Sequence, residues 1–380
     1  MPDPRLASLP TPCLVLDEGR MMRNIDRLAA RAQELGVALR PHLKTAKSTE
    51  VAARLLTGGN GPATVSTLAE AEVFADAGVT DILYAVGIAP RKLARVAAIR
   101  ARGCDLSVIL DAMDQARAVA DASRTAGHPI PALIEIDSDG HRGGLAPDDP
   151  AIVAIARHLH ENGAEMRGVV THAGESYGVS GRVAHAAFAG RERDAVVAAA
   201  RALRAAGLPC PVVSVGSTPT AHAADDLTGV TELRAGVYVF FDLVMAGIGA
   251  CTTDDIACSV LTSVIGRNET RGWILIDAGW MALSRDRGTA AQAIDQFYGT
   301  VCDEGGRAVP DLVVLQANQE HGIVARRPGT GGPLPDLPVG TLLRILPNHA
   351  CATAAQHDRY HVIPETAGAP LLEWSRFGGW

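Results

Sequence analysis

The sequence predicts an α/β protein built from a TIM-type (β/α)8 barrel and a separate antiparallel β domain. Between residues 37 and 239, eight strand-like segments alternate with helical ones, and many of these strands are continuous apolar runs, as expected for parallel strands buried on both faces. After about residue 250 the strands become short, with turn residues and no comparable helices between them. No Gly-x-Gly-x-x-Gly motif opens the first unit, which disfavours the competing open doubly wound sheet.

The composition is that of a globular protein able to bury a large core. The chain has 380 residues, of which 47% are hydrophobic and 20% charged. A net charge of -7 without a basic cluster argues against nucleic acid or an anionic membrane as a partner. The sequence contains no apolar run of ~18 residues, no secretory signal pattern at its start, and no Cys-x-x-Cys among its dispersed cysteines. We therefore expect a cytoplasmic protein with reduced thiols.

The predicted barrel occupies residues 18–248, and the predicted β domain occupies residues 1–17 and 249–380. The barrel strands are predicted at 37–43, 63–67, 81–86, 105–110, 131–136, 166–171, 210–215 and 232–239. Helical periodicity is found at 21–35, 47–56, 68–77, 91–100, 113–125, 151–162, 184–206 and 221–225. The β-domain strands are predicted at 256–265, 272–277, 312–316, 341–346 and 360–363. An early strand at 12–17 could cross over and join them.

Lys44 follows the first predicted barrel strand. In a barrel of this type, the functional residues lie at the carboxyl ends of the strands. An amine desolvated by the walls of such a site loses part of its preference for the charged form. This suits it to Schiff-base chemistry with a carbonyl substrate or with pyridoxal phosphate. Taken alone, a lysine at such a place is more often a surface residue beside a turn, and only the rest of the chain favours the catalytic interpretation.

A phosphate site is predicted where Gly216, Ser217 and Thr218 follow the seventh strand and precede a short helical segment. Glycine permits close backbone approach, hydroxyls donate hydrogen bonds, and a helix N-terminus carries partial positive charge. An ordinary turn with an N-cap is the alternative interpretation. Together with Lys44, this turn would supply the two anchors that pyridoxal phosphate needs. The end of the eighth strand adds three further candidate cofactor contacts, Gly236, Val237 and Tyr238.

Two arginines and two aromatic residues complete the candidates at the strand ends. Arg142 could bind the phenolate oxygen of the cofactor or orient Lys44, and Arg234 could lie near its ring nitrogen or its phosphate. A salt bridge at the rim of the barrel is the alternative for both arginines. His172 could pack against the cofactor ring or move a proton, and Tyr177 lies nearby in sequence. A structural role in the core is the alternative for these two residues.

A second group of candidates lies in the β domain. His349 and Cys351 are two residues apart in a segment that we expect to be extended, which would place both side chains on one side. An imidazole and a thiolate can hold a divalent metal ion, and thiolate favours zinc. Two protein ligands would leave positions open for water or substrate. The alternatives are a structural pair, or a different ligand set that includes His357, Asp358 or His361.

Six short motifs occur in a fixed order along the chain. They are PHLKT at 41–45, DGHR at 139–142, THAG at 171–174, GST at 216–218, DAG at 277–279 and HAC at 349–351. As an ordered set they resemble the D-serine dehydratase and D-threonine aldolase family, pyridoxal-phosphate enzymes with an alanine-racemase-like barrel. The resemblance covers nearly the whole chain. Runs 81–86, 213–220 and 234–242 most resemble members that dehydrate a D-3-hydroxyaspartate.

The resemblance implies roles for these residues and a reaction class. It implies that Lys44 forms the Schiff base and that His349 and Cys351 bind a divalent metal, either zinc or manganese, magnesium or cobalt. It also implies a small D-3-hydroxy amino acid as substrate, D-threo-3-hydroxyaspartate or D-serine. A homodimer is implied as well, with the β domain of one subunit completing the site of the other.

The reaction type is inferred from one metal ligand. Aldolases of this family tend to carry His-x-Asp where this chain has His-x-Cys, as D-serine dehydratases do. This favours dehydration over aldol cleavage to glycine and an aldehyde. Single-barrel relatives that bind pyridoxal phosphate without clear catalysis are a more distant alternative, and the β domain with His349 and Cys351 argues against them.

Overall fold

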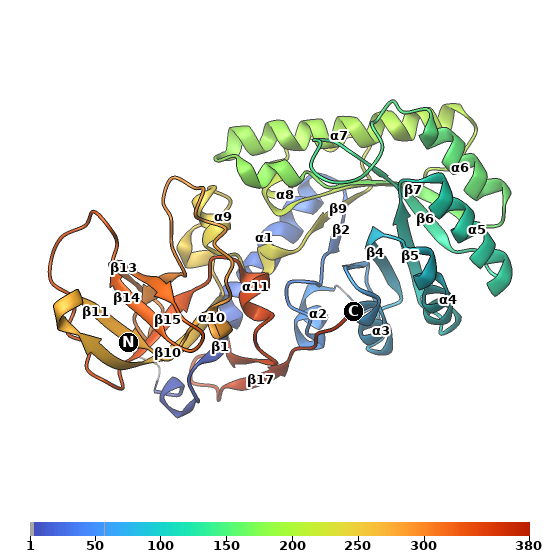
Figure 1. Ribbon diagram of the computed structural model, residues 1–380. Helices are drawn as coiled ribbons and strands as arrows, with labels where there is room; N and C mark the ends of the chain where they lie inside the picture. The colour runs from blue at the N-terminus through green and yellow to red at the C-terminus, as the bar shows by residue number, and fades with distance from the viewer. Residues whose placement is uncertain (1–3, 57) are drawn as a thin grey trace. The chain divides into compact units, whose positions relative to one another are not determined.

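The computed structural model describes residues 4–56 and 58–380, which form two compact units (Figure 1). The barrel unit comprises residues 26–236 with 378–380, and the β unit comprises residues up to Ile25 together with 237–377. Helix α1 (Glu18–Glu34) begins in the β unit and ends in the barrel unit. The sequence had placed the domain boundaries at 17/18 and 248/249.

The barrel unit is built on eight parallel strands, as predicted. Their order in the sheet is β2-β9-β8-β7-β6-β5-β4-β3, so strands that follow each other in sequence are neighbours from β3 to β9. The strands are β2 (Ala38–Pro41), β3 (Ala63–Val65), β4 (Asp81–Gly87), β5 (Asp105–Leu110), β6 (Pro131–Ile136), β7 (Glu165–Thr171), β8 (Val212–Val215) and β9 (Glu232–Ala235). Each lies within a few residues of its predicted range.

The barrel closes between β2 and β3 in a different way from the other strand pairs. Among the described residues, a single bridge between His42 and Thr64 joins them in place of a ladder, and the N–H of Leu43 donates to the carbonyl of Thr64 at 2.9 Å. Arg40 adds a side-chain link, because its guanidinium donates to the carbonyl of Ala63 on β3 and pairs with Asp81 on β4 at 2.7 Å. The result is a near-complete barrel with one weakly paired seam.

Helices connect the barrel strands and cover the outer side of the sheet (Figure 1). They bury apolar residues at helical spacing, and local caps fix their ends. For example, the Thr67 hydroxyl accepts the N–H of Glu70 at the start of α3, and Gly127 ends α5 in the left-handed conformation. The helices are α2 (Thr49–Leu55), α3 (Leu68–Asp76), α4 (Leu93–Ala101), α5 (Met113–Ala126), α6 (Ala151–Glu161), α7 (Arg182–Ala205) and α8 (Thr218–Ala223).

The β unit contains a nine-stranded sheet in the order β11-β14-β13-β12-β15-β10-β1-β16-β17. Because β10 also pairs with β11, the part of the sheet from β10 to β15 closes on itself. The early strand β1 (Cys13–Asp17) pairs antiparallel with β10 and parallel with β16, which confirms the predicted crossover. The other strands are β10 (Cys258–Asn268), β11 (Trp273–Ile276), β12 (Thr300–Cys302), β13 (Ala308–Ala317), β14 (Gly322–Arg326), β15 (Leu342–Leu346), β16 (Arg359–Ile363) and β17 (Leu372–Ser375).

Two sequence-based expectations for the β unit need correction. Strands β12, β14 and β17 were not predicted, because they are short and lack clear alternation. The segment after His349 is not extended, because Ala350–Ala354 form helix α11 and His349 is its N-cap residue. Within the described residues, no helix is long and apolar enough to cross a membrane, and no disulfide bond joins the cysteines.

Candidate active site

Lys44 lies in the turn that follows β2, and its side chain is exposed. The desolvation that the sequence analysis expected at this position is therefore absent, because the turn extends beyond the apolar residues of the strand. Lys47, three residues on, has φ 46° and its ammonium pairs with the buried Glu70 at 3.2 Å. Glu70 also accepts the N–H of Ser66 at 3.0 Å, which ties this turn to the turn after β3. Of the two lysines, Lys44 is therefore the accessible nucleophile.

His42 lies at the base of the same turn, and the sequence analysis did not assign it a role. Its Nε2 is 3.3 Å from the hydroxyl of Ser66. Burial, together with the nearby charges of Lys44 and Arg234, holds the pKa of His42 well below its usual range. The imidazole is therefore neutral beside Lys44. A Cβ at Gly236 would lie 3.1 Å from the Cβ of His42, so the end of β9 approaches this turn closely.

His172 follows β7, and its Nδ1 lies 2.8 Å from the carbonyl oxygen of Gly216. Because a carbonyl only accepts, Nδ1 carries the hydrogen and Nε2 is left as an acceptor. Burial lowers the pKa of His172 to about 3, helped by the charges of Lys44, Arg142 and Arg234 and opposed by the bond to Gly216. Because the charges of these three residues all act on the His172 ring, candidates from the ends of four different strands lie near each other. The ring of Tyr177 is 6.2 Å from it, centroid to centroid.

Gly216 and Ser217 form the turn between β8 and α8. The N–H of Gly216 and the hydroxyl of Ser217 already form hydrogen bonds within the protein. The N–H of Gly216 donates to the carboxylate of Glu192, and the Ser217 hydroxyl caps α8 by accepting the N–H of Thr220 at 3.3 Å. By contrast, the buried hydroxyl of Thr218 has no hydrogen-bond partner among the described residues. Such a hydroxyl at the start of a helix fits a phosphate group.

Glycine at position 216 is required by packing between strands. Gly216 has φ +149°, and a Cβ there would collide with the carbonyl oxygen of Arg234 on β9. The sequence analysis explained this glycine by close approach of the backbone to a phosphate. In this structure a Cβ would first push β8 and β9 apart.

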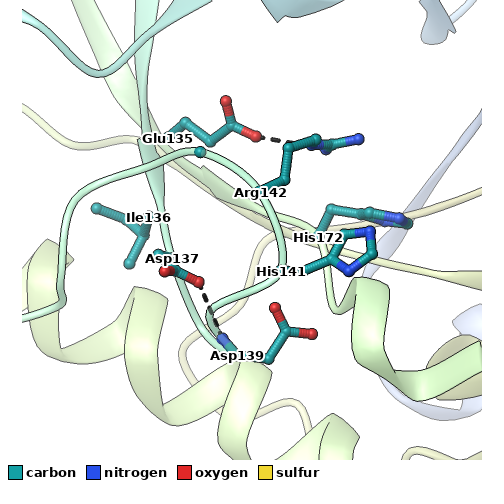
Figure 2. Close-up of a pocket in the computed structure, with 8 residues that line it drawn as sticks. Glu135, Ile136, Asp137, Asp139, His141, Arg142 and His172 are labelled. Atoms are coloured by element: carbon teal, nitrogen blue, oxygen red, sulfur yellow. Dashed lines mark hydrogen bonds and ion pairs between the residues drawn. The ribbon is translucent and has the colours of Figure 1, made fainter. Parts of the chain in front are cut away.

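Arg142 lies in a loop that forms a small pocket after β6 (Figure 2). Its exposed guanidinium is 3.5 Å from the half-buried carboxylate of Glu135, and Figure 2 shows the two side chains turned toward each other. Burial raises the pKa of Glu135 in spite of the Arg142 charge. His141 in the same loop binds Glu175 at 2.7 Å, and a Cβ at Gly174 would collide with its ring. The loop is thus fixed at its tip, whereas Arg142 remains accessible.

Arg234 is buried in the barrel unit and bonds to neighbouring strands. It donates to the hydroxyl of Ser214 at 2.8 Å and to the carbonyl of Thr171. The sequence analysis had weighed a salt bridge at the rim of the barrel against cofactor binding, whereas these contacts are hydrogen bonds to a hydroxyl and to a backbone carbonyl. Val237 and Tyr238 follow in the short helix η4 (Val237–Val239), where both are buried and belong to the β unit.

His349 and Cys351 lie together at the start of α11 in the β unit. Burial disfavours a charged imidazole, but hydrogen bonds to Asp286 and Cys351 and the charges of Cys351 and Asp242 raise the pKa of His349 to about 11. The bond from Nδ1 to the Asp286 carboxylate is 2.6 Å long and leaves Nε2 for another partner. Asp242 accepts the N–H of Ala350 at 2.9 Å and so holds the first turn of α11.

The alternative metal ligands do not join this pair. His357 bonds instead to the carbonyl of Ala282 at 3.0 Å. Across residues 4–56 and 58–380, no three His, Cys, Asp or Glu side chains form a group that could hold a metal ion. A cation here would take two protein donors, and imidazole with thiolate is a set suited to zinc.

Comparisons with known proteins give the family. Residues 16–244 match the family described as "Alanine racemase, N-terminal domain", and residues 257–363 match a serine dehydratase domain family. D-threo-3-hydroxyaspartate dehydratase of Delftia sp. (strain HT23) is 54% identical over 99% of both chains. The chain belongs to the D-serine dehydratase and D-threonine aldolase family. Its barrel unit is the alanine-racemase-like part.

Other members of the family are more distant. D-serine dehydratase of Dictyostelium discoideum is 28% identical over 94% of both chains, and D-threonine aldolase of Arthrobacter sp. is 30% identical over 99% of this chain and 95% of its own. The solved structure of the Delftia dehydratase superposes with a TM-score of 0.95, at 54% identity and 99% coverage of both chains. Alanine racemase of Clostridium difficile, 14% identical with a TM-score of 0.70, shares the fold.

Within this family fold, the structure brings the candidates into two groups. Lys44, Arg142, His172 and the turn at Gly216 belong to the barrel unit, whereas His349 and Cys351 belong to the β unit. Sequence reasoning placed His42 at a strand end without giving it a role, and it missed Glu192, Asp242 and Asp286, which hold these groups. A signal for Glu192 existed, because it interrupts a stripe of small and apolar residues along α7.

Proposed function

We propose that this protein is a pyridoxal-phosphate- and divalent-metal-dependent dehydratase of D-3-hydroxy amino acids. Its substrate would be D-threo-3-hydroxyaspartate, converted to oxaloacetate and ammonia, with D-serine to pyruvate and ammonia as the related reaction. The observation that carries this proposal is the 54% identity to D-threo-3-hydroxyaspartate dehydratase over 99% of both chains. Water leaves in the elimination step and is taken up again when ammonia is released, so the atoms balance.

The barrel unit fits pyridoxal phosphate at two points. Lys44 would attach the cofactor covalently, and the buried hydroxyl of Thr218, which has no hydrogen-bond partner among the described residues, would bind its phosphate. Arg142 and Arg234 remain candidates for the ring substituents, as do Tyr177, Gly236, Val237 and Tyr238 for further contacts. When bound, the cofactor ring accepts the electron pair that is left when the α-proton departs.

The residues of the barrel unit also suggest which side chain removes the α-proton of the substrate. Once the substrate amine has replaced it, Lys44 becomes a free amine at an exposed position and can take the proton from Cα. His172 stays neutral, since its pKa is about 3, and it offers Nε2 as an acceptor. We therefore assign the base to Lys44 and an orienting role to His172.

In the β unit, His349 and Cys351 would hold a divalent metal ion, with zinc as the first choice and manganese, magnesium or cobalt as alternatives. Such an ion supplies a Lewis acid that eases departure of the 3-hydroxyl group. Asp286 would fix the His349 ring so that Nε2 faces the ion. Two solved mutants of D-threo-3-hydroxyaspartate dehydratase support this assignment. In one, a cysteine is replaced and the structure is metal-free. In the other, a histidine two positions before that cysteine is replaced, and His349 and Cys351 have the same spacing.

Aldol cleavage is the second candidate function. It is favoured by the 30% identity to D-threonine aldolase, and it would give glycine and an aldehyde from the same class of substrate. A pyridoxal-phosphate carrier without catalysis is a third and more distant possibility. The match of residues 257–363 to a serine dehydratase domain argues against it.

Product analysis tests the proposal directly. The purified protein is incubated with D-serine, D-threonine and both D-3-hydroxyaspartates, with and without a chelator. We expect ammonia and oxaloacetate from D-threo-3-hydroxyaspartate, with loss of both when the chelator is present. Glycine with an aldehyde would favour the aldolase, and no product from any substrate would favour the carrier.

We also propose a cytoplasmic homodimer that completes its sites between subunits. Light scattering of the eluting protein measures its mass against the 39.6 kDa of one chain. A monomer with full activity would contradict this part of the proposal.

A further inference from the structure

Glu192 is a buried acid for which the proposed reaction has no use. It lies in the middle of α7, on the stripe that faces the barrel strands, and its exposed fraction is 2%. Burying a carboxylate at such a place is costly unless its oxygens accept hydrogen bonds. Its hydrogen bonds therefore indicate what the residue does.

The Glu192 carboxylate accepts three hydrogen bonds from two different loops. Its Oε1 accepts the N–H of Ala173 at 3.0 Å and the N–H of Gly216 at 2.9 Å. Its Oε2 accepts the hydroxyl of Thr220 at 2.9 Å. Ala173 belongs to the loop after β7, Gly216 belongs to the turn after β8, and Thr220 lies in the first turn of α8, which follows directly. One side chain thus joins the loop that carries His172 to the turn that carries the predicted phosphate site.

The contacts continue from Thr220 to the turn itself. The Thr220 hydroxyl also accepts the N–H of Ser217 at 3.1 Å, and the Ser217 hydroxyl caps the same residue in return. The peptide group that follows Gly216 is held as well, because His172 donates to its carbonyl oxygen at 2.8 Å. Thr218 lies inside this frame, and its buried hydroxyl has no partner in the part of the chain that the structure describes.

We infer that Glu192 is a positioning residue for the cofactor phosphate. It does not touch the phosphate; it fixes the turn at 216–220 from behind, so that the Thr218 hydroxyl is already in place when the phosphate arrives. This inference rests on the proposed function, because it requires that pyridoxal phosphate binds at this turn. A binding loop held in its bound shape avoids the ordering cost that a mobile loop pays on binding.

A carboxylate is the group that this position needs. Three donors converge on it and no acceptor does, and an ionised carboxylate is the side chain that only accepts. Glutamine would keep one accepting oxygen for the two backbone N–H groups, and the Thr220 hydroxyl would then turn to the Ser217 carbonyl, 3.3 Å away. Alanine would leave two buried N–H groups without an acceptor, and the turn would have to move to satisfy them.

The test compares two cofactors that differ only in the phosphate. The full-length apoprotein is titrated with pyridoxal phosphate and with pyridoxal, and binding is followed by protein fluorescence. We expect Glu192→Ala to weaken binding of pyridoxal phosphate by about tenfold to a hundredfold and binding of pyridoxal by less than about twofold. For Glu192→Gln we expect a loss of only about twofold to fivefold for pyridoxal phosphate.

A matched control separates positioning from general stability. Glu70 is another buried carboxylate of the barrel unit that accepts a backbone N–H, but it holds the turns after β2 and β3. Glu70→Ala should lower the melting temperature and leave the ratio of the two affinities unchanged. Equal losses for both cofactors in Glu192→Ala, or an unchanged affinity for pyridoxal phosphate, would overturn the inference.

A second variant decides the question if Glu192→Ala does not fold. Thr220→Val removes the hydroxyl that links Glu192 to Ser217 and keeps the size of the side chain. It should weaken binding of pyridoxal phosphate about threefold to tenfold and leave pyridoxal unaffected. No selective loss in this variant would contradict the role of Glu192. Failure of the wild-type protein to bind pyridoxal phosphate would instead reject the proposed function.

Discussion

The barrel unit and the β unit each contain a partly exposed histidine that is central to its candidate site, but the two histidines are held by different partners. In the barrel unit, Nδ1 of His172 donates to a backbone carbonyl, that of Gly216. In the β unit, Nδ1 of His349 is 2.6 Å from the carboxylate of Asp286. The pKa values differ as well. Burial, opposed by the bond to Gly216, lowers the pKa of His172 to about 3. For His349, burial is outweighed by the hydrogen bonds to Asp286 and Cys351, which raise its pKa to about 11.

This difference teaches what each ring can do. A carbonyl partner fixes the orientation of the imidazole and leaves it neutral, which suits a residue that packs against or accepts from a cofactor. A carboxylate partner makes the ring a stronger donor to a cation, as in many metal sites. We therefore assign an orienting role to His172 and metal binding to His349 as proposals, and the following predictions test that difference.

The largest effect is expected from Lys44, to which we assign covalent attachment of the cofactor. Lys44→Ala should abolish the borohydride-reducible link to the cofactor and lower kcat roughly a thousandfold or more, with the melting temperature unchanged because the side chain is exposed. Lys47→Ala is the matched control. It should lose stability, because Glu70 is left unpaired, but keep the link. A reducible link in Lys44→Ala would assign the attachment to another lysine.

The next largest effect concerns the β unit. His349→Ala and Cys351→Ala should each lower kcat by about a hundredfold or more while the visible spectrum of the bound cofactor is retained, because the attachment belongs to the barrel unit. Exchange of the α-proton into deuterated solvent should survive better than product formation. A chelator should reproduce this behaviour in the wild-type protein. Full activity in either variant or in metal-free protein would make the pair structural.

A smaller effect is expected from Asp286, the partner of the proposed metal ligand His349. Asp286→Asn should weaken metal affinity about tenfold to a hundredfold, because the ring loses its charged acceptor. Metal content after dialysis against graded chelator measures this, and affinity for pyridoxal phosphate should not change. An Asp286→Asn variant with wild-type metal affinity would remove the proposed difference between the two histidines.

The smallest effect is a pH dependence from His172. Its pKa in the folded protein is about 3, below the 6.5 of an unperturbed histidine, so between these values the unfolded chain binds a proton that the native state does not. Stability therefore falls as the pH drops from 6.5, by about 2 kcal/mol at pH 5 from this residue. His172→Gln should lose less stability between pH 7 and pH 5, as measured by urea unfolding. An identical loss in both proteins would place the His172 pKa near its usual value.

The strand ends of the barrel could be predicted because the hydrophobic pattern of the sequence marks where each strand stops. A continuous apolar run followed by polar residues marks the carboxyl end of a parallel strand, and this placed Lys44, His172 and Gly216 at one edge. The start of α11 could not be found in this way. A five-residue helix with no side-chain cap leaves little periodic signal, so His349 and Cys351 were expected on an extended segment.

The supporting carboxylates were missed for a different reason. Glu192, Asp242 and Asp286 act on groups far away in sequence, and a pattern within one element carries no information about such partners. An acid in a buried stripe, as at Glu192, is the kind of local inconsistency that marks such residues. Such an acid indicates that hydrogen-bond donors lie nearby in the fold, but the sequence does not show which residues supply them.

The seam between β2 and β3 has a consequence for how Lys44 moves. The other neighbouring strands of the sheet are joined by ladders of backbone hydrogen bonds. In the described chain, the segment that leads into Lys44 is joined to β3 by one bridge, which includes the bond from Leu43 to Thr64. Opening this segment breaks few hydrogen bonds, so its amides should exchange with solvent sooner than those of the opposite strands β6 and β7. The proposed role of Lys44, which is to hold the cofactor and then to take a proton, would thus fall to a residue next to the strand pair with the fewest backbone hydrogen bonds in the described barrel.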